Sequence, residues 1–125
     1  MPFEISESDG FAIVSIEGSL NALDLLFMLQ SRDYKSVIAK YDKVLIDYSD
    51  VIGSSLTMEE AVCITLLGKM DLDNQQGIHI AVAVIENERA VMEKVTAELF
   101  SNGDAKVTIV KSKQQGIDIL NLPSR

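Results

Sequence analysis

The segment from Ile78 to Ile85, Ile-His-Ile-Ala-Val-Ala-Val-Ile, is apolar at nearly every position. A strand with one solvated face alternates apolar and polar residues, whereas a strand covered on both faces is apolar throughout. This segment therefore predicts an interior strand of a parallel sheet that is covered on both sides. Val44-Leu45-Ile46 is a shorter run of the same kind, and it predicts a second buried strand from about Lys43 to Tyr48.

The N-terminal residues predict an antiparallel β-hairpin. Phe3–Ser6 and Phe11–Ile16 have strand-like apolar patterns on either side of Ser8-Asp9-Gly10. Asp-Gly between two such stretches is a strong hairpin signal. Gly18 is predicted to end the second strand of this hairpin.

Helical patterns separate the remaining strands, the last of which is predicted at Lys106–Val110. The first helical segment extends to Tyr41, either as one helix or as two helices divided near Ser31. Thr57 and Glu60 have the spacing of a capping box, which predicts the start of a helix that extends to Met70. The predicted N-caps of the helices are Asn21, Thr57, Asn87 and Ser112.

The resulting order of elements is ββαβαβαβα. Strands that alternate with helices form right-handed crossovers in a parallel sheet, and the first strand is left to pair antiparallel at an edge. We therefore predict an α/β fold with a mostly parallel sheet, an antiparallel N-terminal edge strand and helices packed on the sheet. Residues 1–125 show no internal repeat or linker and are expected to form a single domain.

Charge and composition exclude several classes of protein. The formal net charge of −8 would repel phosphate backbones, so nucleic-acid binding is disfavoured. No apolar run approaches the ~20 residues of a membrane-spanning helix. A single cysteine cannot form an internal disulfide, and the acidic N-terminus lacks the pattern of a signal peptide. We expect a cytoplasmic protein.

The segment that follows the strand at Val44 carries the main candidate site. A buried parallel strand that leads through a loop into a helix often positions a binding surface in α/β proteins. The predicted partner-binding residues are Gly53, Ser54, Ser55, Leu56 and Thr57. The two serines could hold a phosphate at the helix N-terminus, or they could simply be small polar turn residues.

Asp47 and Asp50 are the only candidates for acid–base or cation chemistry beside this loop. No third ligand stands at metal-binding spacing, and no nucleophile lies nearby in the sequence. Aspartate side chains commonly accept hydrogen bonds from nearby backbone amides, so loop anchoring is the favoured role. His79 is the only histidine and is expected to be structural. We predict no metal, no cofactor and no enzymatic activity.

An apolar cleft between the helix that begins near Met58 and the next helix is the alternative candidate site. Methionine side chains suit adaptable apolar surfaces. The residues predicted to line this cleft are Met58, Leu66, Met70 and Met92. The same residues are equally well explained as helix faces that pack against the sheet.

The order of elements and the central stretch resemble the STAS domain family, which includes the sulfate-transporter and anti-sigma-factor-antagonist domains. The hairpin ends in Ile16-Glu17-Gly18-Ser19-Leu20, similar to the strand-Gly-x-Leu of the family. Asp47-Tyr48-Ser49-Asp50-Val51-Ile52-Gly53-Ser54-Ser55-Leu56 is similar to the pattern of the divergent SpoIIAA-like branch. The anti-sigma-factor antagonists have Asp-Ser-Ser/Thr-Gly at this turn, whereas this chain has Gly53 and Leu56 at the outer positions.

The resemblance implies a non-enzymatic, regulatory protein-interaction module of a bacterial cytoplasmic pathway. Its partner would bind at residues 53–57 and at the helix that follows. The SpoIIAA-like branch is also structurally similar to lipid-binding Sec14-type (CRAL-TRIO) domains, which favours a hydrophobic small molecule as the alternative ligand. The exposed face of the hairpin or of the helix from Met58 could form a symmetric homodimer.

Overall fold

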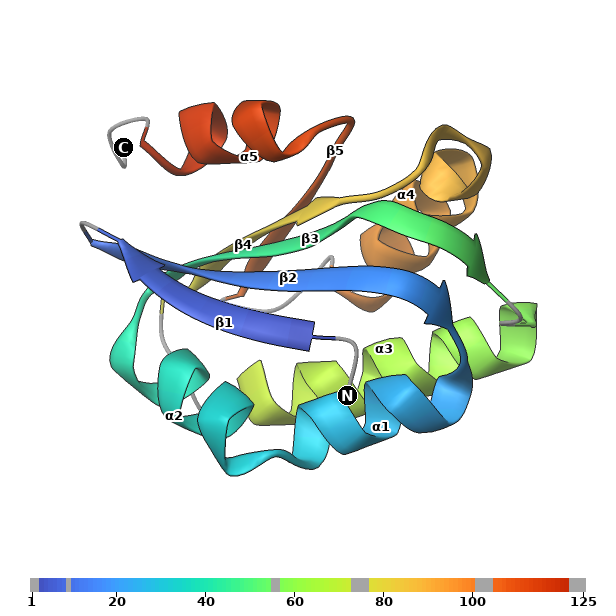
Figure 1. Cartoon of the computed structure of the whole chain (residues 1–125), viewed down its shortest axis with the longest axis horizontal. Coiled ribbons are helices and arrows are strands. Elements are labelled where there is room, and N and C mark those ends of the chain that lie inside the picture. The colour runs from blue at the N-terminus through green and yellow to red at the C-terminus, as the bar shows by residue number, and fades with distance from the viewer. Residues whose placement is uncertain (1–2, 9, 55–56, 73–76, 101–104, 122–125) are drawn as a thin grey trace.

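A computed structural model describes residues 3–8, 10–54, 57–72, 77–100 and 105–121. It contains a five-stranded sheet in the order β1-β2-β3-β4-β5, in which β1 and β2 are antiparallel and the other pairs are parallel (Figure 1). The strands are β1 (Phe3–Ser8), β2 (Phe11–Leu20), β3 (Lys43–Ser54), β4 (His79–Ala83) and β5 (Lys106–Val110). The helices are α1 (Ala22–Gln30), α2 (Arg32–Lys40), α3 (Met58–Leu72), α4 (Glu86–Leu99) and α5 (Lys113–Leu120). The predicted α/β fold, with its antiparallel edge strand, is confirmed.

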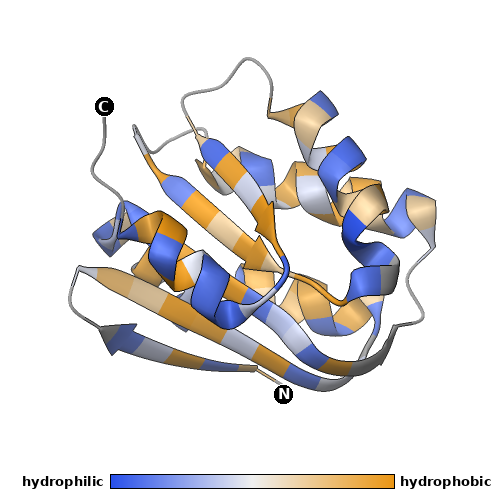
Figure 2. Ribbon diagram, turned by 90° about the horizontal axis from the view of Figure 1, so that it is seen from above, coloured by the Kyte–Doolittle hydropathy of each residue, from blue (hydrophilic) through white to orange (hydrophobic). Residues whose placement is uncertain are grey.

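The sheet is covered by helices on both faces, but unequally. Figure 1 shows α1, α2 and α3 below the sheet and α5 above it. Residues of α4 pack into the same core cluster as those of α1, α2 and α3. In Figure 2, apolar positions alternate with more polar ones along several strands. The larger part of the core therefore lies between the sheet and the layer of α1 to α4.

Alternation along the strands divides the core into two clusters. In β3, Val44 and Ile46 face the layer of α1 to α4, whereas Leu45 faces α5. In β4, Ile80 and Val82 face the first layer, and Ala81 and Ala83 face α5. Successive side chains of a strand point to opposite faces, so a run that is apolar throughout serves both clusters. This confirms the interior position predicted for both strands.

Two strands extend further than their sequence patterns predict. Gly18 does not end β2, because at φ +82° it lies beside a register shift through which the strand continues to Leu20. The extended β2 pairs with β3 beyond Tyr48, as far as Ser54. Glycine adopts a positive φ without steric cost, so it allows a bulge here in place of a strand end. The predicted end of the central strand at Tyr48 is therefore wrong.

The first helical segment consists of two helices that share one capping residue. Ser31 has extended dihedral angles (φ −67°, ψ 145°) and ends α1, where its backbone N–H donates to the carbonyl of Met28. Its hydroxyl oxygen then accepts from the backbone N–H of Tyr34, 3.1 Å away, and caps α2. The sequence was compatible with either one helix or two helices in this segment, and in the structure Ser31 divides the segment into two.

Three of the four predicted N-caps are confirmed. Asn21 accepts from the backbone N–H of Asp24 at 2.9 Å, and Ser112 accepts from that of Gln115 at 3.1 Å. The capping box of α3 is complete in both directions, with Thr57 Oγ1 and Glu60 Oε1 each accepting from the other residue's backbone N–H. The prediction for α4 is wrong, because the helix begins at Glu86 and Ile85 occupies the cap position.

Candidate functional site

The turn between β3 and α3 starts later than the sequence predicts. Gly53 and Ser54 belong to the backbone of β3, so they are strand residues in the structure. Ser55 and Leu56 lie outside the described residues. Thr57 is exposed and is engaged in the capping box of α3. Of the five predicted partner-binding residues, only Thr57 therefore has a described side chain.

Asp47 and Asp50 lie in different environments. The side chain of Asp47 is only 4% exposed, and its Oδ1 accepts from both the backbone N–H and the hydroxyl of Ser49. Asp50 is exposed and pairs in register with Glu17 of β2. Among the described residues, no group of three His, Cys, Asp or Glu side chains is arranged to hold a metal ion. Asp47 holds the local backbone of β3.

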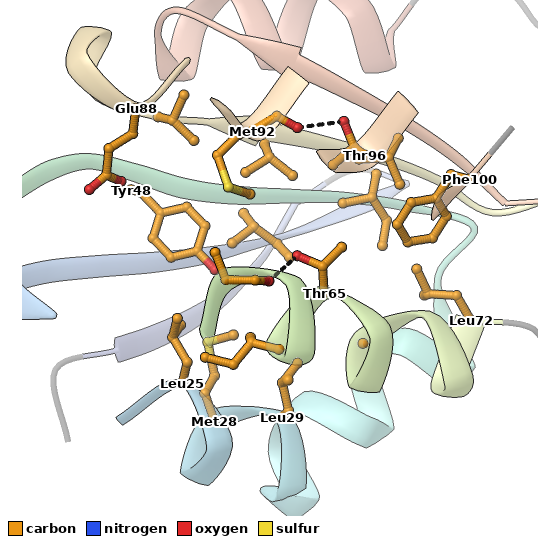
Figure 3. Close-up of a pocket in the computed structure, with 18 of the residues that line it drawn as sticks. Leu25, Met28, Leu29, Tyr48, Thr65, Leu72, Glu88, Met92, Thr96 and Phe100 are labelled. Carbon is orange, nitrogen blue, oxygen red and sulfur yellow. Dashed lines mark hydrogen bonds between the residues drawn. The ribbon is translucent and has the colours of Figure 1, made fainter. Parts of the chain in front are cut away.

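A cavity of about 110 Å³ lies between the sheet and the helices of the thicker layer (Figure 3). Side chains from helices α1 and α3, strands β3 and β4, and helix α4 converge on it. Its main apolar lining residues are Leu25, Met28, Leu29, Ile46, Ile64, Leu72, Ile80, Val82, Met92 and Phe100. No protein atoms fill the space between these side chains, so they lack dispersion contacts on the cavity side.

The two threonine hydroxyls at the cavity are already hydrogen-bonded within their own helices. Thr65 Oγ1 donates to the carbonyl of Ala61 at 2.7 Å, and Thr96 Oγ1 donates to that of Met92 at 2.8 Å (Figure 3). These bonds use the donor capacity of both side chains. The threonines therefore present mainly their methyl groups and leave the middle of the cavity apolar.

Tyr48 and Glu88 are the other polar groups at this cavity. Burial raises the pKa of the Tyr48 phenol, with a smaller contribution from the negative charge of Glu88, so the phenol is neutral at physiological pH. Within the part of the chain that the structure describes, the Tyr48 hydroxyl makes no hydrogen bond, whereas every fully buried side-chain nitrogen or oxygen has a partner. Figure 3 shows this hydroxyl pointing toward α3 and Glu88 at the edge of the cluster.

The structure corrects the predicted lining of the apolar cleft. Met92 lines the cavity, but Met58, Leu66 and Met70 are exposed and are not among its lining residues. The face of α3 that meets the cavity consists of Ala61, Ile64, Thr65, Gly68 and Leu72. Apolar residues occur on all sides of this helix, so their periodicity could not identify its inward face.

Sequence reasoning also missed Tyr48 and most of the α4 lining. Glu88, Met92, Thr96 and Phe100 all line the cavity and recur every four residues. That spacing places side chains on one face of a helix and was a usable signal, although it mixes charged and apolar types. Tyr48 carried no such signal, because its strand was predicted to end there.

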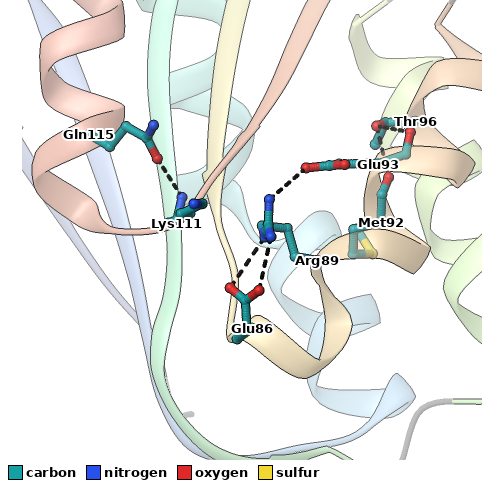
Figure 4. Close-up of polar contacts among 7 residues, drawn as sticks. All are labelled: Glu86, Arg89, Met92, Glu93, Thr96, Lys111 and Gln115. Carbon is teal, nitrogen blue, oxygen red and sulfur yellow. Dashed lines mark hydrogen bonds and ion pairs between the residues drawn. The ribbon is translucent and has the colours of Figure 1, made fainter.

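The charged residues near the start of α4 pair with one another. Figure 4 shows the guanidinium of Arg89 between the carboxylates of Glu86, 2.9 Å away, and Glu93, 3.4 Å away. The hydrogen bond from Arg89 and the positive charge of its guanidinium lower the pKa of the Glu86 carboxyl. In the same view, Gln115 of α5 accepts from the backbone N–H of Lys111, which fastens the start of α5. These contacts stabilise helix ends. Glu86, Arg89 and Glu93 belong to α4, which also lines the cavity, but these three residues are not part of the lining.

No helix of the described residues is long and apolar enough to span a bilayer. No family model matches the sequence, and neither does any curated protein. Two solved structures are similar over 94% of this chain. One is an uncharacterised protein of the DUF3478 family with a SpoIIAA-like fold from Shewanella loihica, with 20% identity, a TM-score of 0.59 and 91% of that chain covered. The other is the anti-sigma factor antagonist SpoIIAA in its unphosphorylated form, with 12% identity, a TM-score of 0.57 and 96% of that chain covered. The chain therefore has the SpoIIAA-like fold of the STAS domains.

Proposed function

We propose that this chain is a non-enzymatic module of a bacterial cytoplasmic regulatory pathway that binds a protein partner. The binding surface would consist of the β3–α3 turn and the outer face of α3. The fold supports a protein partner, since one structure that shares it is an anti-sigma factor antagonist. The observation that carries the proposal is the apolar character of the outer face of α3.

Helix α3 exposes four large apolar side chains, one at its first residue and three about two turns further along the helix. Met58 is 51% exposed, Leu66 42%, Leu67 41% and Met70 66%. Single exposed apolar side chains are ordinary on protein surfaces, but Leu66, Leu67 and Met70 are neighbours on the helix, and a contiguous set of this kind marks an interaction site. On the neighbouring helix α1, Leu23 and Phe27 are also exposed. We name the set of Met58, Leu66, Leu67 and Met70 the α3 patch.

Charge favours a basic partner. Glu59 is exposed beside Met58 at the start of the α3 patch, and the whole chain carries a net charge of −8. Complementary charge at the rim of an interface steers encounter and excludes wrong partners, while the apolar centre supplies most of the affinity. The expected partner surface is apolar at its centre and carries lysine or arginine at its edge.

Affinity capture from cells of the source organism tests the α3 patch. We expect wild-type protein to retain a partner that Met70→Glu binds about tenfold or more weakly, because a charge at an apolar interface centre must be desolvated. Val91→Glu is the matched control, since Val91 is an exposed apolar residue of α4 outside the patch. Equal retention of the partner by wild type and Met70→Glu would exclude the patch as its binding site.

The turn is tested separately with Ser54→Glu and Ser55→Glu. A carboxylate introduced here adds negative charge to a segment that directly precedes Glu59 and Glu60 in the sequence, so binding of the same partner should weaken if the turn belongs to the interface. Ser36→Glu, on the exposed side of α2, controls for the added charge alone. Sedimentation of wild type and Met70→Glu shows whether the partner is a second copy of this chain.

A further inference from the structure

We infer that the cavity between the sheet and the thicker helix layer binds a neutral small molecule of about single-ring size, with one hydrogen-bonding group that meets Tyr48. This site goes beyond the proposed protein interaction. It lies on the inner face of α3, whereas Leu66, Leu67 and Met70 of the α3 patch lie on the outer face. The same helix would therefore carry two sites on opposite sides.

The size of the cavity limits the ligand. Its volume is about 110 Å³. A cavity of about 150 Å³ lined by Leu, Ile and Phe can bind benzene, whereas a cavity that holds one water molecule needs only about 10 to 15 Å³. The space is thus too large to be an ordinary packing gap and too small for a whole lipid. It fits one ring or a short branched chain.

The lining selects against water and ions. Water is held in a cavity by two to four polar partners, and the hydroxyls of Thr65 and Thr96 already donate to carbonyls of their own helices. The remaining walls are mainly aliphatic, with side chains such as Leu25, Ile64 and Leu72. A charged group would lose its hydration here without a counter-charge. An apolar molecule would instead gain the dispersion contacts that the lining lacks.

Tyr48 and Glu88 set the polar end of the ligand. The Tyr48 hydroxyl has no partner among the described residues and is able both to donate and to accept a hydrogen bond. Glu88 lines the edge of the same cavity, and its negative charge repels anions. A neutral hydroxyl group can hydrogen-bond to Tyr48, whereas a carboxylate would be repelled by the charge of Glu88. We therefore expect a phenol-like or alcohol-like compound to bind and a carboxylic acid to be rejected.

The test uses benzene, phenol and benzoate as probes of the intact protein. Chemical-shift titrations should give saturable binding of benzene and phenol, with phenol about three- to tenfold tighter because of its hydrogen bond to Tyr48. Benzoate should bind at least tenfold more weakly than phenol. Intermolecular NOEs should connect phenol protons to methyl groups of Leu25, Ile64 and Leu72, all of which line the cavity.

Two variants locate the site. Ala61→Leu places three additional carbon atoms at the cavity wall and should abolish binding of both neutral probes. Ala97→Leu is the matched control on the exposed side of α4 and should leave binding unchanged. Tyr48→Phe should bind benzene and phenol with equal affinity, because only the hydroxyl is removed.

Failure of benzene and phenol to saturate the wild-type protein, or binding that persists in Ala61→Leu, would overturn the assignment of the cavity. If Ala61→Leu does not fold, the NOEs still decide the test, because the absence of NOEs to the cavity residues in wild-type protein would also overturn the assignment of the cavity. A phenol preference that survives in Tyr48→Phe would overturn the role of Tyr48. None of these measurements depends on the protein partner.

Discussion

Two helical glycines show how the surroundings of one residue decide the effect of a methyl group. Gly68 lies on the cavity side of α3, and a Cβ added there would meet only Leu29 Cδ2, at 3.9 Å. Gly116 lies where α5 packs on the sheet, and a Cβ there would come within 2.5 Å of Leu45 Cδ1. Leu45 is fully buried, so it has little room to move.

We expect Gly68→Ala and Gly116→Ala to change stability in opposite directions. Gly68→Ala should raise the free energy of unfolding by about 0.5 to 1 kcal/mol, because alanine restricts the unfolded chain and suits a helix. Gly116→Ala should lower it by about 1 kcal/mol or more, because overpacking outweighs the same gain. Urea unfolding of both variants measures this, and a stabilised Gly116→Ala would show that α5 packs more loosely than the structure indicates.

At the scale of elements, the pairing of strands brings together charged residues that lie far apart in the sequence. His79 begins β4 and lies in register between Lys43 of β3 and Lys106 of β5. One of its ring nitrogens, Nε2, lies 3.0 Å from the hydroxyl of Thr108. Burial and the positive charges of Lys106 and Lys43 lower the pKa of His79 below its ordinary value of 6.5.

We expect the NMR titration of His79, the only histidine, to give a pKa below 6.5 that rises in Lys106→Gln. Lys94→Gln on α4 is the control. Because the folded pKa is the lower one, the unfolded state binds more protons below pH 6.5. The contribution to stability is thus complete above pH 6.5 and is lost as the pH falls toward the folded pKa. An unchanged pKa in Lys106→Gln would remove this lysine as a cause.

At the scale of the whole molecule, contacts between layers join the sheet edge to the helices. Glu7 of the edge strand β1 accepts hydrogen bonds from Lys40 and Tyr41 at the end of α2, at 3.0 and 2.7 Å. These partners lower the pKa of the Glu7 carboxyl, with the Tyr41 hydroxyl as the largest cause. The contact is solvent-exposed, so it fastens the edge strand without adding to the core.

We expect Glu7→Gln to destabilise the protein at neutral pH, and we expect this difference to vanish in acid. The folded pKa of Glu7 lies below its ordinary value of 4.5, so its contribution is present above pH 4.5 and is lost as the pH falls through the folded pKa. Thermal unfolding at pH 7 and pH 3 measures the difference. Glu4→Gln, exposed on the same strand, is the control. A difference that stays constant with pH would contradict the electrostatic explanation.

Local sequence was sufficient for the fold and for most helix starts. The run from Ile78 to Ile85 predicted a strand covered on both faces, because consecutive residues of a strand point to opposite faces and all of these are apolar or nearly so. Asn21, Thr57 and Ser112 predicted helix starts because a cap is a contact between residues three apart. Such features need no knowledge of distant segments.

The inward face of α3 and the true length of β3 were decided only by the tertiary structure. β3 continues to Ser54 because β2, more than 30 residues away in sequence, bulges at Gly18 and extends beside it. Apolar residues occur on all sides of α3, so packing against α1, α4 and the sheet selected Ile64 and Leu72 for the interior and left Met70 outside. By itself, the sequence determined the elements and their order, since these depend on neighbouring residues. The cavity and the exposed patch depend on which surfaces meet, and only the assembled layers specify that.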